Sequence, residues 1–267
     1  MTDGSIDIDA AGTTLEVRVL GDASGPTVIW GHGLMGSIAG EDELPLIDWA
    51  SAAPGHRVVR YDARGHGQSV STDGEFDYRW DRLADDQLAL ADALGIERYT
   101  AAGASMGAAT ALYAALAAPE RIERLVLVIP PTAWETRRDQ VDLYATMADL
   151  IETGRTDVLL RGADATPLPD PLDERSRERH KGVMTTTDAI RLARVLRGAG
   201  RTDLPPREEI MRLAQPALIL AWTGDPGHPV STAEQLAELL PNSSVRIASE
   251  AAELATWPSA IAGFLER

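Results

Sequence analysis

Residues 103–107 read Gly-Ala-Ser-Met-Gly, and they join a strand-like stretch around 98–102 to an alanine-rich, helix-like stretch at 106–118. The pattern predicts a strand, a sharp turn that carries Ser105, and a helix. Small residues beside the serine let such a turn close without side-chain clashes. We interpret the segment as a nucleophile elbow, in which the serine hydroxyl projects into a cleft and the backbone N–H of Met106 faces a developing oxyanion.

Strand-like and helix-like stretches alternate on both sides of this turn. Such alternation is typical of a mostly parallel sheet that helices cover on both faces, and the unbroken apolar run at 125–129 fits a strand buried on both faces. Residues 5–9 and 14–20 alternate in polarity around Ala11-Gly12, which predicts an N-terminal hairpin. The other predicted elements are strands at 27–30, 56–61, 217–222 and 244–248, and helices at 43–52, 80–94, 231–240 and from about 256.

One long segment, residues 132–205, interrupts this alternation. It is polar and helix-prone, and several prolines divide it. We interpret it as a helical cap inserted into a single α/β core that residues 1–131 and 206–267 form. The predicted cap helices are short and amphipathic, near 138–152, 155–161 and 186–197.

The composition excludes several classes of function. The chain has 267 residues and a formal net charge of −16, with acidic residues scattered along it, so nucleic acid is not an expected partner. The absence of cysteine excludes disulfides, a thiolate nucleophile and cysteine-ligated zinc. No cofactor and no metal are expected. The expected partner is a small-molecule substrate, and a homodimer is left open.

The N-terminus and the hydropathy pattern bear on location. Residues 1–10 are acidic and lack the basic and apolar regions of a signal peptide. No window reaches the roughly 18 apolar residues that a membrane span needs. We therefore expect a cytoplasmic location and no membrane partner.

Four motifs occur in an informative order. His32-Gly33 follows a strand, residues 62–69 read Asp-Ala-Arg-Gly-His-Gly-Gln-Ser, Ser105 occupies the elbow, and Gly224-Asp225-Pro226 follows the penultimate strand. On these motifs the chain resembles the α/β-hydrolase fold superfamily over nearly all of its length. The resemblance implies hydrolysis of a small ester, lactone or related acyl compound through an acyl-serine intermediate. Relatives of this shape include enol-lactonases, esterases and C–C bond hydrolases.

The resemblance also assigns roles around the serine. The residue after the His-Gly pair, Leu34, would supply a second oxyanion N–H beside that of Met106. His32 is expected to organise its loop and is counted with Trp134 and Tyr144 among the substrate-binding residues. In the 62–69 motif, Asp62, Arg64 and His66 are expected to fix loops.

The resemblance also implies a Ser-Asp-His triad. The sequence offers an aspartate at the expected place but no histidine at the expected place. Asp225 follows an apolar strand, where the superfamily keeps its acid, and it comes after Ser105 in chain order as expected. The resemblance predicts a histidine after the last strand, in the stretch 247–254, and none is present. Because a serine hydroxyl is a poor nucleophile without a neighbouring base, this gap bears on the mechanism.

Three explanations for the gap compete. His228 is a candidate base, although its close spacing from Asp225 makes the usual bridge to the acid look awkward. A carboxylate base from Glu250 or Glu253 would need burial to raise its pKa. In the third explanation the histidine has been replaced, which would leave a ligand-binding or lyase-like protein with an incomplete triad. Ala251 and Ala252 are the natural positions for such a replacement.

The predicted cap offers two sets of residues that bear on specificity. An apolar set could line a pocket above the serine, and a basic set could meet a carboxylate. Ordinary helix packing and solvated faces account for most of both sets. The apolar set is Trp134, Tyr144, Met147, Met184 and Leu196, and the basic set is Arg175, Arg177, Arg179, His180, Arg191 and Arg194.

Overall fold

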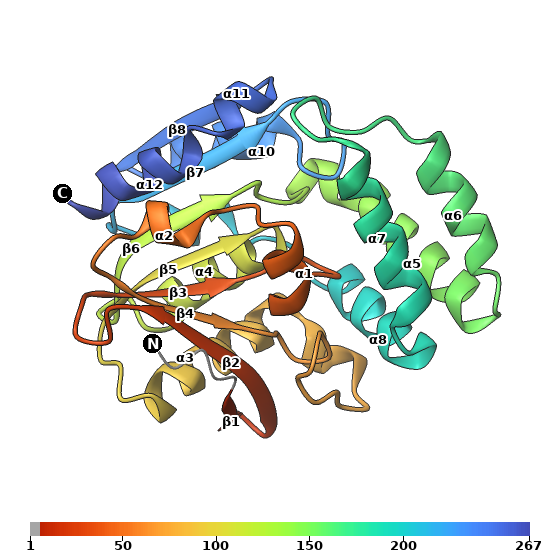
Figure 1. The fold of residues 1–267 in the computed structure, drawn as a ribbon, viewed down its shortest axis with the longest axis horizontal. Helices are drawn as coiled ribbons and strands as arrows, with labels where there is room; N and C mark the ends of the chain where they lie inside the picture. The colour runs from red at the N-terminus through yellow and green to blue at the C-terminus, as the bar shows by residue number, and fades with distance from the viewer. Residues whose placement is uncertain (1–5) are drawn as a thin grey trace.

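The computed structural model describes residues 6–267, and its centre is an eight-stranded sheet (Figure 1). The strand order is β1-β2-β4-β3-β5-β6-β7-β8; β2 pairs antiparallel with β1 and β4, and every other neighbouring pair is parallel. The mostly parallel α/β fold expected from the sequence is confirmed. The strands are β1 (Ile6–Ala10), β2 (Thr13–Gly21), β3 (Thr27–Gly31), β4 (Arg57–Tyr61), β5 (Tyr99–Ala104), β6 (Ile122–Val128), β7 (Ala217–Trp222) and β8 (Ser243–Ala248).

Helices cover both faces of the sheet. The apolar residues of β5 and β7 are buried along their whole length, as the sequence pattern requires of doubly covered strands. One hydrophobic cluster packs α3, α4 and α10 on one face, and a second packs α2 and α12 on the other (Figure 1). The helices outside the predicted cap are α1 (Ile38–Glu43), α2 (Trp49–Ala52), α3 (Trp80–Ala93), α4 (Met106–Ala117), α9 (Arg207–Ile210), α10 (Val230–Leu239), α11 (Ala251–Leu254) and α12 (Trp257–Leu265). Two 3₁₀ turns are also present, η1 (Glu75–Tyr78) outside the predicted cap and η2 (Trp134–Thr136) at its beginning.

The strand order reverses direction at the carboxyl ends of β3 and β5. From β3 the chain moves to one side to form β4, and β5 then pairs with β3 on its other side. Loops that leave such neighbouring strands diverge and leave room for a ligand between them. Ser105 follows β5 and the His32-Gly33 loop follows β3, so the fold brings the two motifs together.

Four of the helices between β6 and β7 fall within the predicted cap segment and lie beside the carboxyl edge of the sheet (Figure 1); we call them the cap helices. The expected division into a core and a cap at residues 132–205 stays a prediction. The sequence missed the third of these helices, because its mostly polar residues give a weak amphipathic signal; Asp173 caps its first turn. The cap helices are α5 (Arg137–Glu152), α6 (Thr156–Ala165), α7 (Glu174–Thr186) and α8 (Ala189–Gly200).

The predicted helix at 43–52 is wrong. Two short helices, α1 and α2, flank residues 44–48 instead, and this segment contains Pro45. Proline disfavours helical conformation in the residue before it, and Ser37 and Asp48 cap the two separate helices. The N-terminal hairpin is confirmed from Ile6 onward, and residue 5 of the prediction lies outside the described residues.

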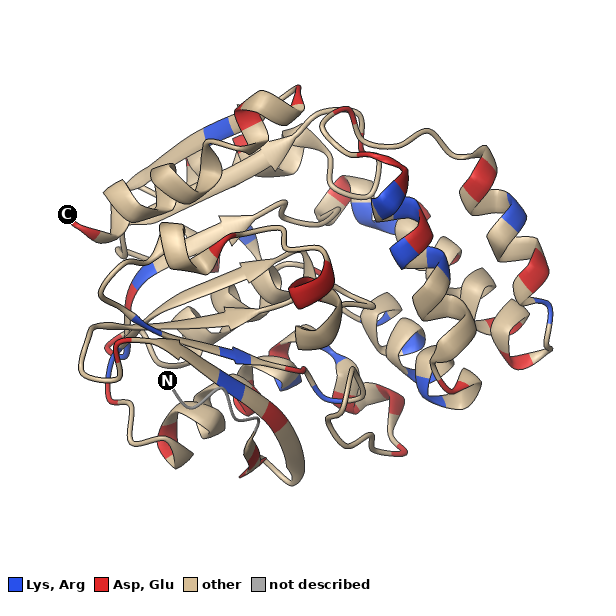
Figure 2. Cartoon of the chain, in the orientation of Figure 1, with Lys and Arg blue, Asp and Glu red and all other residues tan. Residues whose placement is uncertain are grey.

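Charge is spread over the whole chain. Acidic residues occur on the sheet, its helices and the cap helices, and α7 carries a group of basic residues (Figure 2). Across residues 6–267, none of the helices is both long and apolar enough to cross a membrane.

Candidate active site

Ser105 lies on a sharp turn between β5 and α4. Its φ and ψ are 51° and −109°, a conformation that residues with a side chain rarely adopt. A Cβ added to Gly107 would lie 2.0 Å from the carbonyl oxygen of Gly31, and one added to Gly103 would lie 2.2 Å from the backbone of Gly107. Glycine is therefore needed on both sides of the serine, because backbone packs directly against backbone here.

The structure brings Ser105, His228 and Asp225 into one hydrogen-bonded row. His228 Nε2 lies 2.8 Å from Ser105 Oγ, and His228 Nδ1 lies 2.8 Å from Asp225 Oδ2. The expectation that the spacing of Asp225 and His228 makes their contact awkward is wrong. A turn, in which the His228 N–H donates to the Asp225 carbonyl at 3.2 Å, sets their two side chains beside each other.

Three groups donate hydrogen bonds to the Asp225 carboxylate. Oδ2 accepts from Trp222 Nε1 at 2.8 Å and from His228, while Oδ1 accepts from the Gly227 N–H at 2.9 Å. Burial alone would raise the pKa of Asp225, but these hydrogen bonds and the charge of His228 lower it to about 2. The carboxylate is therefore ionised at any ordinary working pH. An ionised acceptor at Nδ1 favours the tautomer that leaves Nε2 free to accept the serine proton.

The loop after β8, where the resemblance predicts a histidine, has a different structure. Glu253 is exposed, and it accepts hydrogen bonds from the N–H and hydroxyl of Ser249 at 2.7 and 2.8 Å. These bonds lower the pKa of Glu253, whereas a carboxylate base would need it raised. Glu250 is exposed at the start of α11. The carboxylate-base explanation is therefore wrong for both residues.

The loop after β3 lies against the elbow. A Cβ added to Gly33 would lie 3.6 Å from Ser105 Cβ, and the Gly36 N–H closes a turn onto the Gly33 carbonyl at 2.8 Å. Among residues 6–267 the N–H of Leu34 has no acceptor. Met106 is the first residue of α4, where backbone N–H groups have no partner within the helix. Both expected oxyanion donors are thus available beside the serine.

His32 holds this loop in place. Its Nε2 accepts from the Ala63 N–H at 3.0 Å, and its Nδ1 lies 2.8 Å from the Gly33 carbonyl, so Nδ1 carries the proton. The side chain is buried and both ring nitrogens are occupied by backbone. The expectation that His32 binds substrate is therefore wrong, and its expected role as a loop organiser fits these contacts.

Residues 62–69 also fix loops, as expected. Asp62 accepts from the Ile38 N–H at 2.6 Å and from the Gln68 N–H at 2.8 Å. Arg64 forms a buried ion pair with Asp86. Burial and the neighbouring His32 lower the pKa of His66 to about 3, so its imidazole stays neutral.

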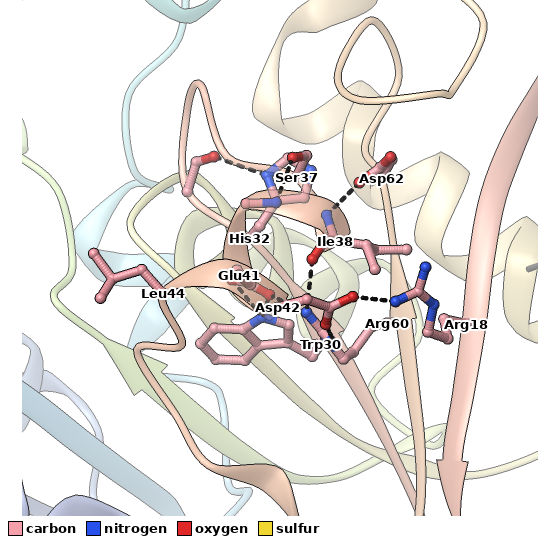
Figure 3. A network of polar contacts seen from close by, with 12 residues as sticks. Arg18, Trp30, His32, Ser37, Ile38, Glu41, Asp42, Leu44, Arg60 and Asp62 are labelled. Atoms are coloured by element: carbon pink, nitrogen blue, oxygen red, sulfur yellow. Dashed lines mark hydrogen bonds and ion pairs between the residues drawn. The ribbon is translucent and has the colours of Figure 1, made fainter. Parts of the chain in front are cut away.

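A polar network anchors α1, the helix that follows the oxyanion loop (Figure 3). Trp30 Nε1 donates to both carboxylate oxygens of Glu41 at 2.9 Å. Arg60 donates to Asp42 at 2.6 Å and to Glu41 at 3.2 Å, and Arg18 also pairs with Asp42. These bonds tie α1 to β2, β3 and β4. The loop that carries Gly33, Leu34 and Gly36 is therefore held at both ends.

Trp134 makes its polar contacts with the far end of the predicted cap segment. Its indole nitrogen donates to the Pro205 carbonyl at 3.1 Å, its backbone N–H donates to Asp203, and the Arg207 guanidinium lies 4.2 Å from its ring centroid. The residue joins the two ends of the segment that carries the cap helices. These contacts give Trp134 a structural role, and its expected role in substrate binding stays a prediction.

Tyr144 remains a substrate-binding candidate. It belongs to a cap cluster that also includes Met147, Met184 and Leu196, and the oxyanion-loop residues Leu34 and Met35 pack into the same cluster. The charge of Asp225 contributes to the raised pKa of Tyr144, which burial mainly causes. An apolar surface from the cap helices thus meets the loop beside the serine.

Most of the expected basic residues are already occupied. Arg179 donates to the carbonyls of Gly40 and Leu44, and Arg191 donates to the Gly67 carbonyl. These contacts fasten the cap helices to the loops around the sheet. Arg194 pairs with Asp73, and Arg177 pairs with Glu174 and donates to two α6 carbonyls.

Sequence reasoning missed two contacts to the turn that carries the acid and the base. Trp222 donates to the carboxylate, and Asp170 accepts from the Thr223 hydroxyl at 2.6 Å. A tryptophan at the buried end of a strand needs an acceptor for its N–H, and this was the available signal. The contact from Asp170 has no local signal, because more than fifty residues separate the partners.

Comparison with known proteins identifies the family. A family model described as the alpha/beta hydrolase fold matches residues 26–161. The chain belongs to this family. The 3-oxoadipate enol-lactonase 1 of Acinetobacter baylyi is 28% identical over 229 residues, which cover 84% of this chain and 80% of that protein. A putative carbamate hydrolase, RutD, of Agrobacterium fabrum is 27% identical and covers 86% of this chain and 87% of its own length.

Solved structures show the same hydrolase fold. The enol-lactonase of Burkholderia xenovorans superposes with a TM-score of 0.79 over 98% of this chain and all of its own, at 22% identity. A hydrolase from Pseudomonas aeruginosa has a TM-score of 0.76 over 99% of this chain and 98% of its own, at 25% identity.

Proposed function

We propose that this alpha/beta hydrolase cleaves small esters, lactones or related acyl compounds through an acyl-serine intermediate. The observation that carries the proposal is the unbroken hydrogen-bonded row from Asp225 through His228 to Ser105, with both contacts at 2.8 Å. A serine with a neighbouring base that a third group orients is the arrangement of nucleophilic catalysis. The relatives named as an enol-lactonase and a carbamate hydrolase support the acyl class of substrate.

The first half-reaction forms the acyl-enzyme. Ser105 Oγ attacks the carbonyl carbon while His228 Nε2 takes the hydroxyl proton. The negative charge that develops on the carbonyl oxygen is stabilised by the N–H groups of Leu34 and Met106, a pair in which each donor contributes roughly 3 kcal/mol. As the intermediate collapses, the imidazolium returns the proton to the leaving oxygen. An ester then releases an alcohol, whereas a lactone keeps its new hydroxyl attached to the acyl group.

The second half-reaction restores the serine. Water attacks the acyl carbon and gives a proton to His228, and the acyl–oxygen bond to Ser105 breaks as that proton passes to Oγ. The product is a carboxylic acid. Asp225 stays ionised throughout and stabilises the imidazolium that forms in each half-reaction.

The alternative of a ligand-binding or lyase-like protein depended on an incomplete triad. The contacts of His228 remove that premise, because a base lies against the serine. We therefore favour turnover over binding alone.

The test is covalent labelling by a fluorophosphonate probe, followed by intact mass. We expect one label per chain, its absence from the Ser105→Ala variant, and its retention in Ser244→Ala, a control at an exposed serine on β8. Hydrolysis of p-nitrophenyl acetate by the wild type and not by Ser105→Ala would complete the evidence. A folded protein that neither labels nor hydrolyses would overturn the proposal.

A further inference from the structure

Trp222 occupies the last position of β7, where the strand meets the turn that carries the acid and the base. It is 5% exposed, so its indole is held among packed side chains. Its ring stacks on Trp257 of α12 at 6.1 Å between centroids, with an interplanar angle of 13°. The same ring meets His228 edge-on, at 6.3 Å and 89°. The indole is therefore fixed by a rigid strand and helix before it contacts the site.

The donors to the Asp225 carboxylate differ in origin. The Gly227 N–H and the His228 ring both belong to the same turn as the carboxylate, so they move with it. Trp222 Nε1, at 2.8 Å from Oδ2, is the donor that comes from the strand. It also shares this oxygen with His228 Nδ1, and the orientation of Oδ2 sets the orientation of the imidazole.

We propose that Trp222 is a positioning residue for catalysis, whose indole N–H fixes the carboxylate of Asp225 and through it the imidazole that activates Ser105. The inference rests on the proposed function and deepens it. A triad whose acid and base come from one turn needs an anchor outside that turn, because a shift of the turn moves both groups together. The indole N–H supplies this anchor directly at the shared oxygen.

The anchor acts together with backbone supports of the turn. The Thr132 N–H donates to the Gly227 carbonyl at 3.1 Å, and the Asp170 N–H donates to the Thr223 carbonyl at 3.2 Å. Both bonds restrain the path of the backbone and neither reaches the carboxylate. Rotation of the carboxylate about its own side-chain bonds is therefore restrained by Trp222 and by the turn's own donors.

Loss of the indole N–H has an electrostatic consequence as well. With one donor fewer, Oδ2 keeps more negative charge and stabilises the protonated imidazole more strongly. The acid limb of kcat/KM then moves to higher pH, because the imidazole must be neutral to accept the serine proton. The Ser105 hydroxyl contacts the imidazole, and the charge of Asp225 acts on Tyr144 of α5, whose raised pKa keeps that phenol neutral through this range.

The test compares Trp222→Phe with Trp257→Phe. Both variants keep an aromatic ring in the stacked pair, and the first alone removes a hydrogen bond to Asp225. For Trp222→Phe we expect kcat to fall by about tenfold or more, the effect of one charge-assisted hydrogen bond on a rate, with little change in KM. Its acid limb should move to higher pH, and Trp257→Phe should show neither change.

A double-mutant cycle separates positioning from packing. In an Asp225→Asn background the Trp222→Phe change should have little further effect on kcat, because its acceptor charge is gone. Additive losses, or an acid limb that stays in place, would overturn the inference. These outcomes differ from failure of the proposed function, in which Ser105→Ala would keep the activity of the wild type. Thermal unfolding of each variant checks that the fold is retained.

Discussion

The turn after β7 and the loop after β8 both lie at the carboxyl edge of the sheet, and the histidine that the resemblance predicts in the second is found in the first. The turn at 223–228 carries both Asp225 and His228, side by side and partly buried. The loop after β8 carries an exposed Glu253 that caps its own local turn. The comparison teaches that a missing motif residue need not mean missing chemistry, because a nearby loop can deliver the same group to the same atom.

After loss of the base itself, the largest fall in kcat is expected from a change of Asp225, the acid of the turn. Asp225→Asn keeps the shape of the side chain and removes its charge, so the imidazolium loses its stabilising partner and the ring its preferred tautomer. We expect kcat to fall by about 10³- to 10⁴-fold, as for the acid of other serine triads, with unfolding little changed. Steady-state hydrolysis of p-nitrophenyl acetate measures it. A rate within a few-fold of wild type would remove Asp225 from the site.

The pH profile gives the next largest effect. The folded pKa of Asp225, about 2, lies below its ordinary value of 3.8, so any stability from its ionisation is present above that ordinary value and is lost as pH falls toward 2. Asp225 therefore adds no titration to kcat/KM between about pH 4 and pH 9. Profiles of kcat/KM against pH for the wild type and Asp225→Asn measure this, and any limb in that range should be present in both. A limb that the variant lacks would show that the Asp225 carboxylate titrates there.

A smaller fall in kcat is expected from loss of the hydrogen bond between Thr223 of the turn and Asp170 of the cap segment. Thr223→Val removes the hydroxyl that donates to Asp170 and keeps the size of the side chain. Because this bond restrains the turn without touching the acid or the base, we expect kcat to fall by about two- to tenfold, the effect of one neutral hydrogen bond. Thr186→Val, which removes a hydroxyl bonded to the Gly182 carbonyl within α7, is the control and should match wild type. Equal rates for both variants would show that the cap segment does not position the turn.

The smallest effect is expected in the loop after β8. Glu253→Gln keeps an acceptor for the N–H and hydroxyl of Ser249 and removes the charge. Because this side chain is exposed and bonded within its own turn, kcat and KM should equal those of wild type. A loss of activity with an unchanged melting temperature would show that the loop after β8 takes part in the mechanism, contrary to what we expect.

Much of the fold was predictable from the sequence, for a physical reason. The strands that surround the elbow are apolar runs buried on both faces, and their pattern is strong at any position along the chain. The elbow follows from its glycines, which no other residue can replace there. The helix α7 and the break at Pro45 were missed because polar helices and local turns depend on capping and tertiary contacts that periodicity does not record.

The site was predictable only in part. Ser105 and Asp225 have positional signals, whereas the contact of His228 with both depends on the turn geometry at Gly227, which no motif encodes. The sequence places His32 beside the oxyanion loop and Trp134 in the segment predicted to lie above the serine, and both positions favour contact with substrate. Their hydrogen bonds to distant backbone groups, which the structure alone reveals, occupy them elsewhere.

The source of the base is tested most directly by the activity of His228→Ala with and without added imidazole, beside Glu253→Ala and Glu250→Ala. We expect a loss of roughly 10⁴-fold or more in kcat for His228→Ala, the scale for the base of a serine triad, and no loss for the two glutamate variants. Free imidazole should restore part of the activity by entering the space left at Ser105. Full activity in His228→Ala, or a comparable loss in either glutamate variant, would contradict the claim that the turn after β7 supplies the base.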